Sequence, residues 1–237
     1  TAQALLAIMA GMYAVYHGPK GIKAIAERVH TLTQMLDRHL QALGYAQQNE
    51  HYFDTLSIKT SDATLKHVQQ IALGHEINFH YDNDTIQISL DETTSLKDIE
   101  EMVTIFAEAN GKDANFDASE PAHYQIPEKL QRTSAYLTHP VFNSYYTETK
   151  MMRYIKTLEN KDLSLTQSMI PLGSCTMKLN AATELIPVSW AAFANLHPFA
   201  PLDQAQGYLK IFEELEAYLS EITGFAACSL QPNSGAQ

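Results

Sequence analysis

The stretch 168–180 gathers hydroxyl, thiol and amine side chains in one short run. Ser174, Cys175, Thr176 and Lys178 lie within it, after an Ile-Pro pair and a glycine, and their spacing fits neither a helix nor a strand. An ordered loop of this kind is where substrate-binding and catalytic groups concentrate. The same composition also fits a well-packed connector, and the residues alone leave both interpretations open.

The last residues, 232–237, indicate a different chemistry, the binding of an anion. They are mostly small residues that follow a predicted buried strand over 225–230, and they are expected to open a helix. Backbone N–H groups at a helix start, with the helix dipole behind them, bind anions such as a phosphate group. Ser234 adds a hydroxyl donor. A plain strand-to-helix connector is the alternative interpretation.

Cysteines and histidines elsewhere give weaker signals. Cys175 has no histidine near it in sequence, which favours a packed thiol over a nucleophile. Cys228 lies in the predicted strand and is expected in the core. His75 and His80 form a pattern similar to a zinc-protease motif, but their spacing is one residue too long for a shared helical face. We therefore expect no metal site. Two further histidines precede proline and are expected to form structural turns, His139 and His197.

Composition restricts the class of protein. The 237 residues are 45% hydrophobic and 18% charged, which is typical of a globular protein with a core. The formal net charge of -11 argues against nucleic acid or an anionic membrane as the main partner. The longest apolar run, 4–15, is too short to span a bilayer, and we see no signal peptide. Two cysteines without metal or redox spacing favour a reducing compartment, and we predict a cytoplasmic protein.

The elements that must position these groups follow from hydrophobic periodicity. In the first 111 residues the order is helix, strand, helix, hairpin and helix, which predicts a small α/β sandwich with helices on one face of a sheet. Its predicted elements are an apolar helix over 2–16, an amphipathic helix from 21 to the stop at 44, strands around 56–58, 77–81 and 86–90, and helices over 62–73 and 95–109. Ser95 and Asp98 have the spacing of a capping box at the start of the last helix.

Residues 112–145 have little periodicity and several prolines, and we interpret them as an extended linker. After the linker, Met151, Met152, Ile155 and Leu158 mark the inward side of a predicted helix over 147–159. A short helix then ends at a proline, and the strong amphipathic pattern over 203–223 predicts a helix that stops at the following glycine.

Several phrases of this sequence resemble those of one family, glycine decarboxylase, which is the P-protein of the glycine cleavage system. The run Pro-Leu-Gly-Ser-Cys-Thr-Met-Lys-Leu-Asn at 171–180 is the most specific of them, and the others stand in the family's order. The further matching phrases are 16–19 with Gly21, 51–56, 137–143, 196–199 and 231–237.

This resemblance implies a fold-type I enzyme dependent on pyridoxal 5'-phosphate (PLP). In that family the turn with Ser234, Gly235, Ala236 and Gln237 is implied to bind the cofactor phosphate. The loop with Ser174, Cys175, Thr176 and Lys178 is implied to face the substrate. The Schiff-base lysine of the family lies downstream of residue 237, so we assign no catalytic residue to this chain and expect it to be inactive by itself.

The resemblance also implies a division of the chain and a set of partners. Residues 1–111 correspond to the small α/β domain of the first half, 112–145 to the linker, and 146–237 to the beginning of a second PLP-type large domain. The implied reaction is glycine decarboxylation with transfer of the aminomethyl group to a lipoyl carrier protein, in a homodimer, in the cytoplasm or the mitochondrial matrix. The alternatives are a non-catalytic interaction or scaffolding subunit, and another fold-type I PLP decarboxylase or aminotransferase.

Overall fold

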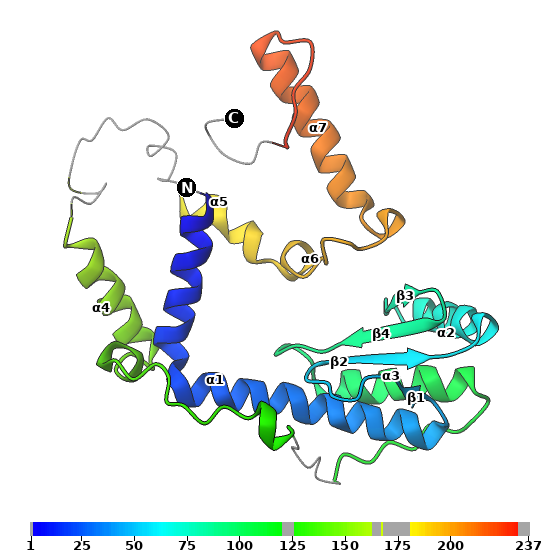
Figure 1. The fold of residues 1–237 in the computed structure, drawn as a ribbon. Coiled ribbons are helices and arrows are strands. Elements are labelled where there is room, and N and C mark those ends of the chain that lie inside the picture. Colours follow the sequence, from blue (N-terminus) through cyan, green and yellow to red (C-terminus); the bar gives the residue numbers. More distant parts are fainter. Residues whose placement is uncertain (1, 120–125, 163–166, 168–180, 232–237) are drawn as a thin grey trace. The chain divides into compact units, whose positions relative to one another are not determined.

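The computed structural model describes residues 2–119, 126–162, 167 and 181–231 (Figure 1). Its contacts divide the chain into two compact units. Unit 1 consists of Thr1–Met12 with Thr147–Gln237, and unit 2 of Tyr13–Tyr146. Each unit is described by itself. The predicted domain boundaries, after residues 111 and 145, stay a prediction.

A long bent helix, α1 (Ala2–Leu43), contributes its residues from Tyr13 onward to unit 2. The predicted break near residue 17 is a kink inside this helix, because only Gly18 leaves helical geometry, with φ 60° and ψ -177°. Pro19 follows at the first turn of the second segment, a position where its missing N–H costs no helical hydrogen bond. Beyond the kink the predicted apolar face is buried, including Leu36 and Leu40, which are completely inaccessible to solvent.

The sheet of unit 2 has four antiparallel strands in the order β1-β2-β4-β3. The strands are β1 (Ala46–Gln47), β2 (Thr55–Lys59), β3 (His80–Asp82) and β4 (Thr85–Ser89). Leu56 pairs with Ile88 and Ile58 with Ile86, and these four side chains are buried. Residues between them along the same strands are only partly buried, as the alternation of a strand requires. The predicted strands near 56–58 and 86–90 and the hairpin between β3 and β4 are confirmed.

The middle predicted strand is shorter than expected, and the end of helix α2 (Asp62–Gly74) explains why. The N–H of Ile77 donates to the carbonyl of Ala72 at 2.9 Å, and Glu76 adopts φ 59°. This amide is therefore used to end the helix and is not available to a sheet. Pairing begins only at His80, while Ile77 and Phe79 still pack against the core.

Helix α3 (Leu96–Ala109) is the last helix of the α/β sandwich in unit 2, and its start confirms the predicted capping box. The Asp98 N–H donates to the Ser95 hydroxyl, and the Ser95 N–H donates to the Asp98 carboxylate at 2.7 Å. The buried residues of α1, α2, α3 and the inner face of the sheet form one cluster. Helices α1 and α3 run along one side of the sheet (Figure 1), so the predicted two-layer α/β sandwich is confirmed.

Between α3 and residue 147, the residues that the structure describes contain only short helical turns. They are η1 (Glu128–Leu130) and η2 (Pro140–Asn143). Unit 1 then follows with α4 (Glu148–Glu159), α5 (Ala182–Leu185), η4 (Ile186–Ser189), α6 (Ala191–Ala194), η5 (Leu202–Gln204) and α7 (Gln206–Thr223). Thr147 caps α4. Gly224, the predicted stop of the last helix, ends α7 in a left-handed conformation.

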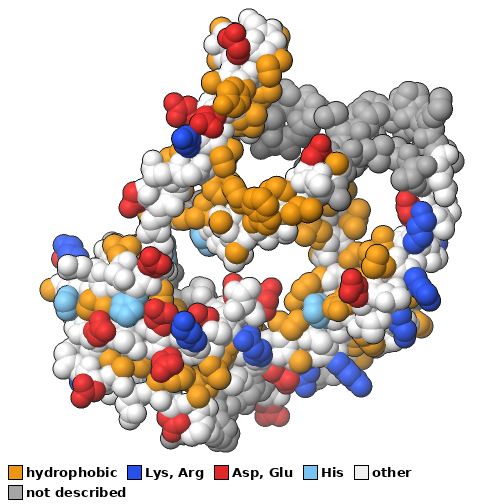
Figure 2. Space-filling view, turned by 180° about the vertical axis from the view of Figure 1, so that it is seen from behind, with side chains coloured by type: hydrophobic (Ala, Val, Ile, Leu, Met, Phe, Trp, Pro, Cys, Tyr) orange, Lys and Arg blue, Asp and Glu red, His pale blue; other side chains and the backbone are white. Residues whose placement is uncertain are grey.

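Side chains in the described part of unit 1 are much more exposed than those of unit 2. Met152 and Ile155, predicted to point inward, are 63% and 48% exposed, so that prediction is wrong for this chain. Hydrophobic side chains also lie exposed along α7 (Figure 2). The periodicity identified the apolar side of each helix, but the described residues of unit 1 provide no surface that buries it.

The predicted buried strand over 225–230 is wrong. These residues form no strand, Phe225 is 73% exposed, and Cys228 is only partly buried rather than in the core. A strand needs a neighbour for its N–H and C=O groups, and no strand lies in the described part of unit 1. Among the helices that the structure describes, none combines the length and the hydropathy needed to cross a bilayer.

Candidate functional site

Both predicted site loops fall outside the described residues. This applies to Ser174, Cys175, Thr176 and Lys178 in the first loop, and to Ser234, Gly235, Ala236 and Gln237 in the second. Their roles stay predictions. The segment that connects the two loops, residues 181–231, is described and belongs to unit 1.

Tight turns shape the first part of this connecting segment. The N–H of Trp190 donates to the carbonyl of Pro187 at 3.1 Å, and the carbonyl of Trp190 accepts from Phe193 at 2.9 Å and from Ala194 at 2.8 Å. These hydrogen bonds join η4 and α6 into one compact turn structure. The chain then reaches α7 through residues 195–205, which include the predicted turn at His197.

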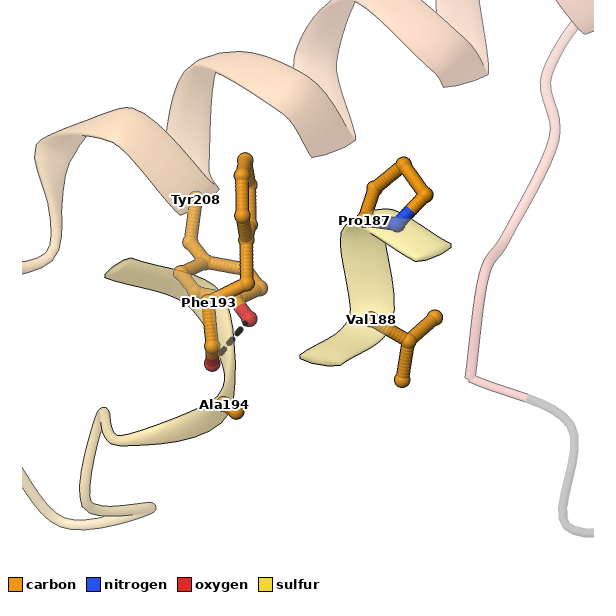
Figure 3. Close-up of a pocket in the computed structure, with 5 residues that line it drawn as sticks. All are labelled: Pro187, Val188, Phe193, Ala194 and Tyr208. Atoms are coloured by element: carbon orange, nitrogen blue, oxygen red, sulfur yellow. Dashed lines mark hydrogen bonds between the residues drawn. The ribbon is translucent and has the colours of Figure 1, made fainter. Parts of the chain in front are cut away.

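A small apolar pocket lies between this turn structure and α7 (Figure 3). Its lining residues are Pro187, Val188, Phe193, Ala194 and Tyr208. The Tyr208 hydroxyl donates to the Phe193 carbonyl at 2.8 Å, and the two rings meet edge to face with centroids 5.8 Å apart. The only side-chain polar group of the lining is therefore already paired.

This pocket does not fit a phosphorylated cofactor. None of its five lining side chains carries a charge, and a phosphate requires cationic groups or free N–H donors. The pocket suits the packing of an apolar group. This pocket thus does not by itself form a PLP site, and no step of a reaction is assigned to its residues.

His139 and His197 are built into turns, which confirms their predicted role. The His139 Nδ1 accepts a hydrogen bond from the Val141 N–H at 3.2 Å, and the His197 Nδ1 accepts one from the Phe199 N–H at 3.0 Å. In both cases the ring caps the amide two residues later, across a proline. The repeated His-Pro pair was the sequence signal for this shared geometry.

The phrase 51–56 is held by buried polar side chains of α1, a role that sequence reasoning missed. His30 Nδ1 donates to the Phe53 carbonyl at 2.7 Å, and the rings of these residues stack with centroids 5.5 Å apart. The Tyr52 hydroxyl donates to the Asp37 carboxylate at 2.7 Å. Burial, followed by this hydrogen bond and the negative charge of Asp37, raises the pKa of Tyr52. Polar residues at 30 and 37, within an otherwise apolar helix face, were the available signal.

The two histidines that resemble a zinc-protease pair lie on different elements. His75 follows α2, where its ring faces Glu101 at 3.4 Å and Glu108 at 3.6 Å on α3. His80 begins strand β3. Within the part of the chain that the structure describes, no three His, Cys, Asp or Glu side chains are grouped as metal ligands would be.

The fold and the two candidate loops first indicate the class of protein. Unit 2 is a two-layer α/β structure with a small antiparallel sheet, followed in sequence by a mainly helical segment that connects two candidate loops. Residues 1–106 match the family model described as glycine cleavage system P-protein.

The whole chain is also similar to proteins named glycine dehydrogenase (decarboxylating). It is 53% identical over 246 residues to the protein of Nostoc sp. and 55% identical over 240 residues to that of Stutzerimonas stutzeri. It is 53% identical over 240 residues to the mitochondrial protein of Pisum sativum. These alignments cover 100% of this chain but only 25%, 25% and 22% of the relatives. The resemblance to the P-protein family is confirmed, and the chain corresponds to about a quarter of the length of these relatives.

Proposed function

We propose that this chain is part of the glycine-decarboxylating P-protein of the glycine cleavage system. The observation that carries the proposal is the identity of 53% or more to three glycine dehydrogenases, which extends over the whole chain. Such identity along every element supports a common fold and a common reaction. The sequence phrases support it further, because they occur in both units and in the family's order.

In this proposal PLP is the cofactor, and it supplies the electron withdrawal that makes the loss of CO2 from glycine possible. The turn with Ser234, Gly235, Ala236 and Gln237 binds the phosphate through backbone N–H groups and the Ser234 hydroxyl. The loop around Cys175 and Lys178 lies beside the substrate. The lysine that bonds the cofactor is contributed by polypeptide outside these 237 residues.

The proposed partners follow from the same reaction. Glycine is the substrate, a lipoyl carrier protein accepts the aminomethyl group, and the complete enzyme is a homodimer. The location is the cytoplasm, or the mitochondrial matrix for a eukaryotic source, as the name of the Pisum sativum relative indicates for that protein.

Reduction with borohydride tests the assignment of the lysine. The chain is incubated with one equivalent of PLP and reduced, and the adduct is measured by intact mass and peptide mapping. We expect no lysine to be labelled stoichiometrically, because a Schiff base without a surrounding pocket is weak and non-selective. Stoichiometric labelling of Lys178 would contradict the proposed roles.

A chimera tests the reaction itself. The matching quarter of the Stutzerimonas stutzeri protein is replaced by this chain, and glycine-dependent CO2 release is measured with a lipoyl carrier protein. Retained activity is expected. A chimera with an unchanged far-ultraviolet circular dichroism spectrum, unchanged oligomeric state and no activity would refute the proposal.

The second candidate is a non-catalytic interaction subunit, and the exposed apolar side chains of α7 favour it. The two candidates differ in one experiment. If the chain is part of the enzyme, a complementary chain that carries the missing lysine restores decarboxylation. If it is an interaction subunit, that addition restores nothing.

A further inference from the structure

Two phrases that lie far apart in the sequence meet at the kink of α1. The first is 16–19 and the second is 137–143, and both belong to unit 2. Gly18 lies against the Phe142 carbonyl, and the hydroxyl of Tyr136, one residue before the second phrase, donates to the Pro19 carbonyl at 2.7 Å across 117 positions. The two phrases, which sequence reasoning treated as separate, thus occupy one junction.

Gly18 is the residue that permits this contact. Its φ of 60° with ψ of -177° belongs to a region that is open essentially to glycine alone. A Cβ atom at this position would lie 2.5 Å from the Phe142 carbonyl oxygen and 2.7 Å from the Tyr146 ring. The Phe142 carbonyl and the Tyr146 ring are therefore packed directly on a glycine, and any other side chain must displace them.

Residues 136–146, on the other side of the junction, are held in one conformation by hydrogen bonds among themselves. Asn143 Nδ2 donates to the carbonyls of Leu137 at 3.1 Å and His139 at 3.3 Å. The Tyr146 hydroxyl lies 3.0 Å from the Phe142 carbonyl and 3.1 Å from the Asn143 side-chain oxygen. Leu137 itself takes φ 48°, a left-handed conformation that few residues other than glycine adopt. These contacts make residues 136–146 a preformed unit rather than an extended tether.

We propose that residues 136–146, which we call the clasp, pack on the kink of α1 and stabilise its bent geometry. In this role Gly18 provides the space, Tyr136 provides the hydrogen bond, and Asn143 holds the clasp in shape. The clasp is also the last part of unit 2 before α4, so it fixes the point from which the chain leaves towards the loop at 168–180. The inference rests on these contacts and not on the proposed enzymatic reaction.

Amide hydrogen exchange of the 237-residue chain tests the clasp with three variants. Gly18→Ala forces a strained backbone and a steric conflict, so we expect exchange within 136–146 to rise about tenfold or more. Tyr136→Phe keeps the ring, including its contact with Arg132, and removes only the hydroxyl. Loss of one such hydrogen bond is expected to raise exchange there about two- to tenfold. Exchange in strands β2 and β4 should not change in either variant.

Gly11→Ala is the matched control, because Gly11 lies in the same helix and has no atom within 4 Å of an added Cβ. It should leave exchange within 136–146 within about twofold of wild type. The double variant Gly18→Ala with Tyr136→Phe should be less than additive, since both changes open the same contact. The clasp is refuted if Tyr136→Phe leaves exchange in 136–146 unchanged. If Gly18→Ala unfolds unit 2 as a whole, Tyr136→Phe alone serves as the test of the clasp.

Discussion

Truncation of Phe106 is expected to lower the stability of unit 2 strongly. This side chain is fully buried at 0% exposure, and its ring centroid lies 4.9 Å from that of Tyr45 and 5.6 Å from that of Phe79. Replacing a buried phenylalanine by alanine costs about 3–5 kcal/mol. The two aromatic pairs, on the order of 0.5–1.5 kcal/mol each, are part of this cost, and alanine recovers roughly 0.5 kcal/mol of helix propensity. We therefore expect Phe106→Ala to lower the free energy of unfolding by about 4 kcal/mol.

The assay must report on unit 2 alone. The single tryptophan, Trp190, belongs to unit 1, so its fluorescence does not follow this transition. Urea titration followed by amide exchange in β2 and β4 does follow it. Leu96→Ala is the control, since Leu96 lies on the same helix but is 48% exposed, and it should cost less than about 1 kcal/mol. A loss below roughly 1.5 kcal/mol for Phe106→Ala would show that this residue is not a central part of the core.

Two other predictions concern a helix cap and a partly buried tyrosine. Ser95→Ala removes the hydroxyl that accepts from the Asp98 N–H, and it should lower the free energy of urea unfolding by about 1 kcal/mol; an unchanged midpoint would contradict the capping role. Burial raises the pKa of Tyr81 from 10.0 to about 12, so the folded state retains a proton that the unfolded state loses. The resulting stability is fully present below about pH 10 and declines as the pH rises towards about 12. Alkaline titration by circular dichroism should show a smaller decline for Tyr81→Phe, and an equal decline would assign the effect to other groups.

Local features of unit 2 were predictable because short-range interactions determine them. The alternation at Leu56 and Ile58 predicted β2, and the spacing of Ser95 and Asp98 predicted the start of α3. Ile77 shows the limit of this reasoning. Its alternation with Phe79 is typical of a strand, but the carbonyl of Ala72 takes its N–H to end α2. A periodicity of side chains contains no information about which partner a backbone amide selects.

The junction at Gly18 and the candidate site depend on contacts that periodicity does not reveal. The sequence placed a break near Gly18 and a proline-rich linker around Tyr136, but not their meeting across 117 positions. For the site, the chemistry of Ser174 and Ser234 was inferred from resemblance, and both lie outside the described residues. The sequence predicted the apolar face of α7 that is exposed here. Local patterns do not show which surface would cover this face.

The lengths of the strands in unit 2 determine how the sheet behaves towards other molecules. Its two inner strands have five residues each, whereas the outer strands β1 and β3 have only two and three. An edge strand with many unpaired N–H and C=O groups is a template for the addition of further strands. Here β3 ends in a turn with Asp82 and Asp84, and Asp84 pairs with Lys59 at 3.3 Å. Short and charged edges of this kind oppose edge-to-edge growth, so folded unit 2 should not nucleate fibrils through its sheet.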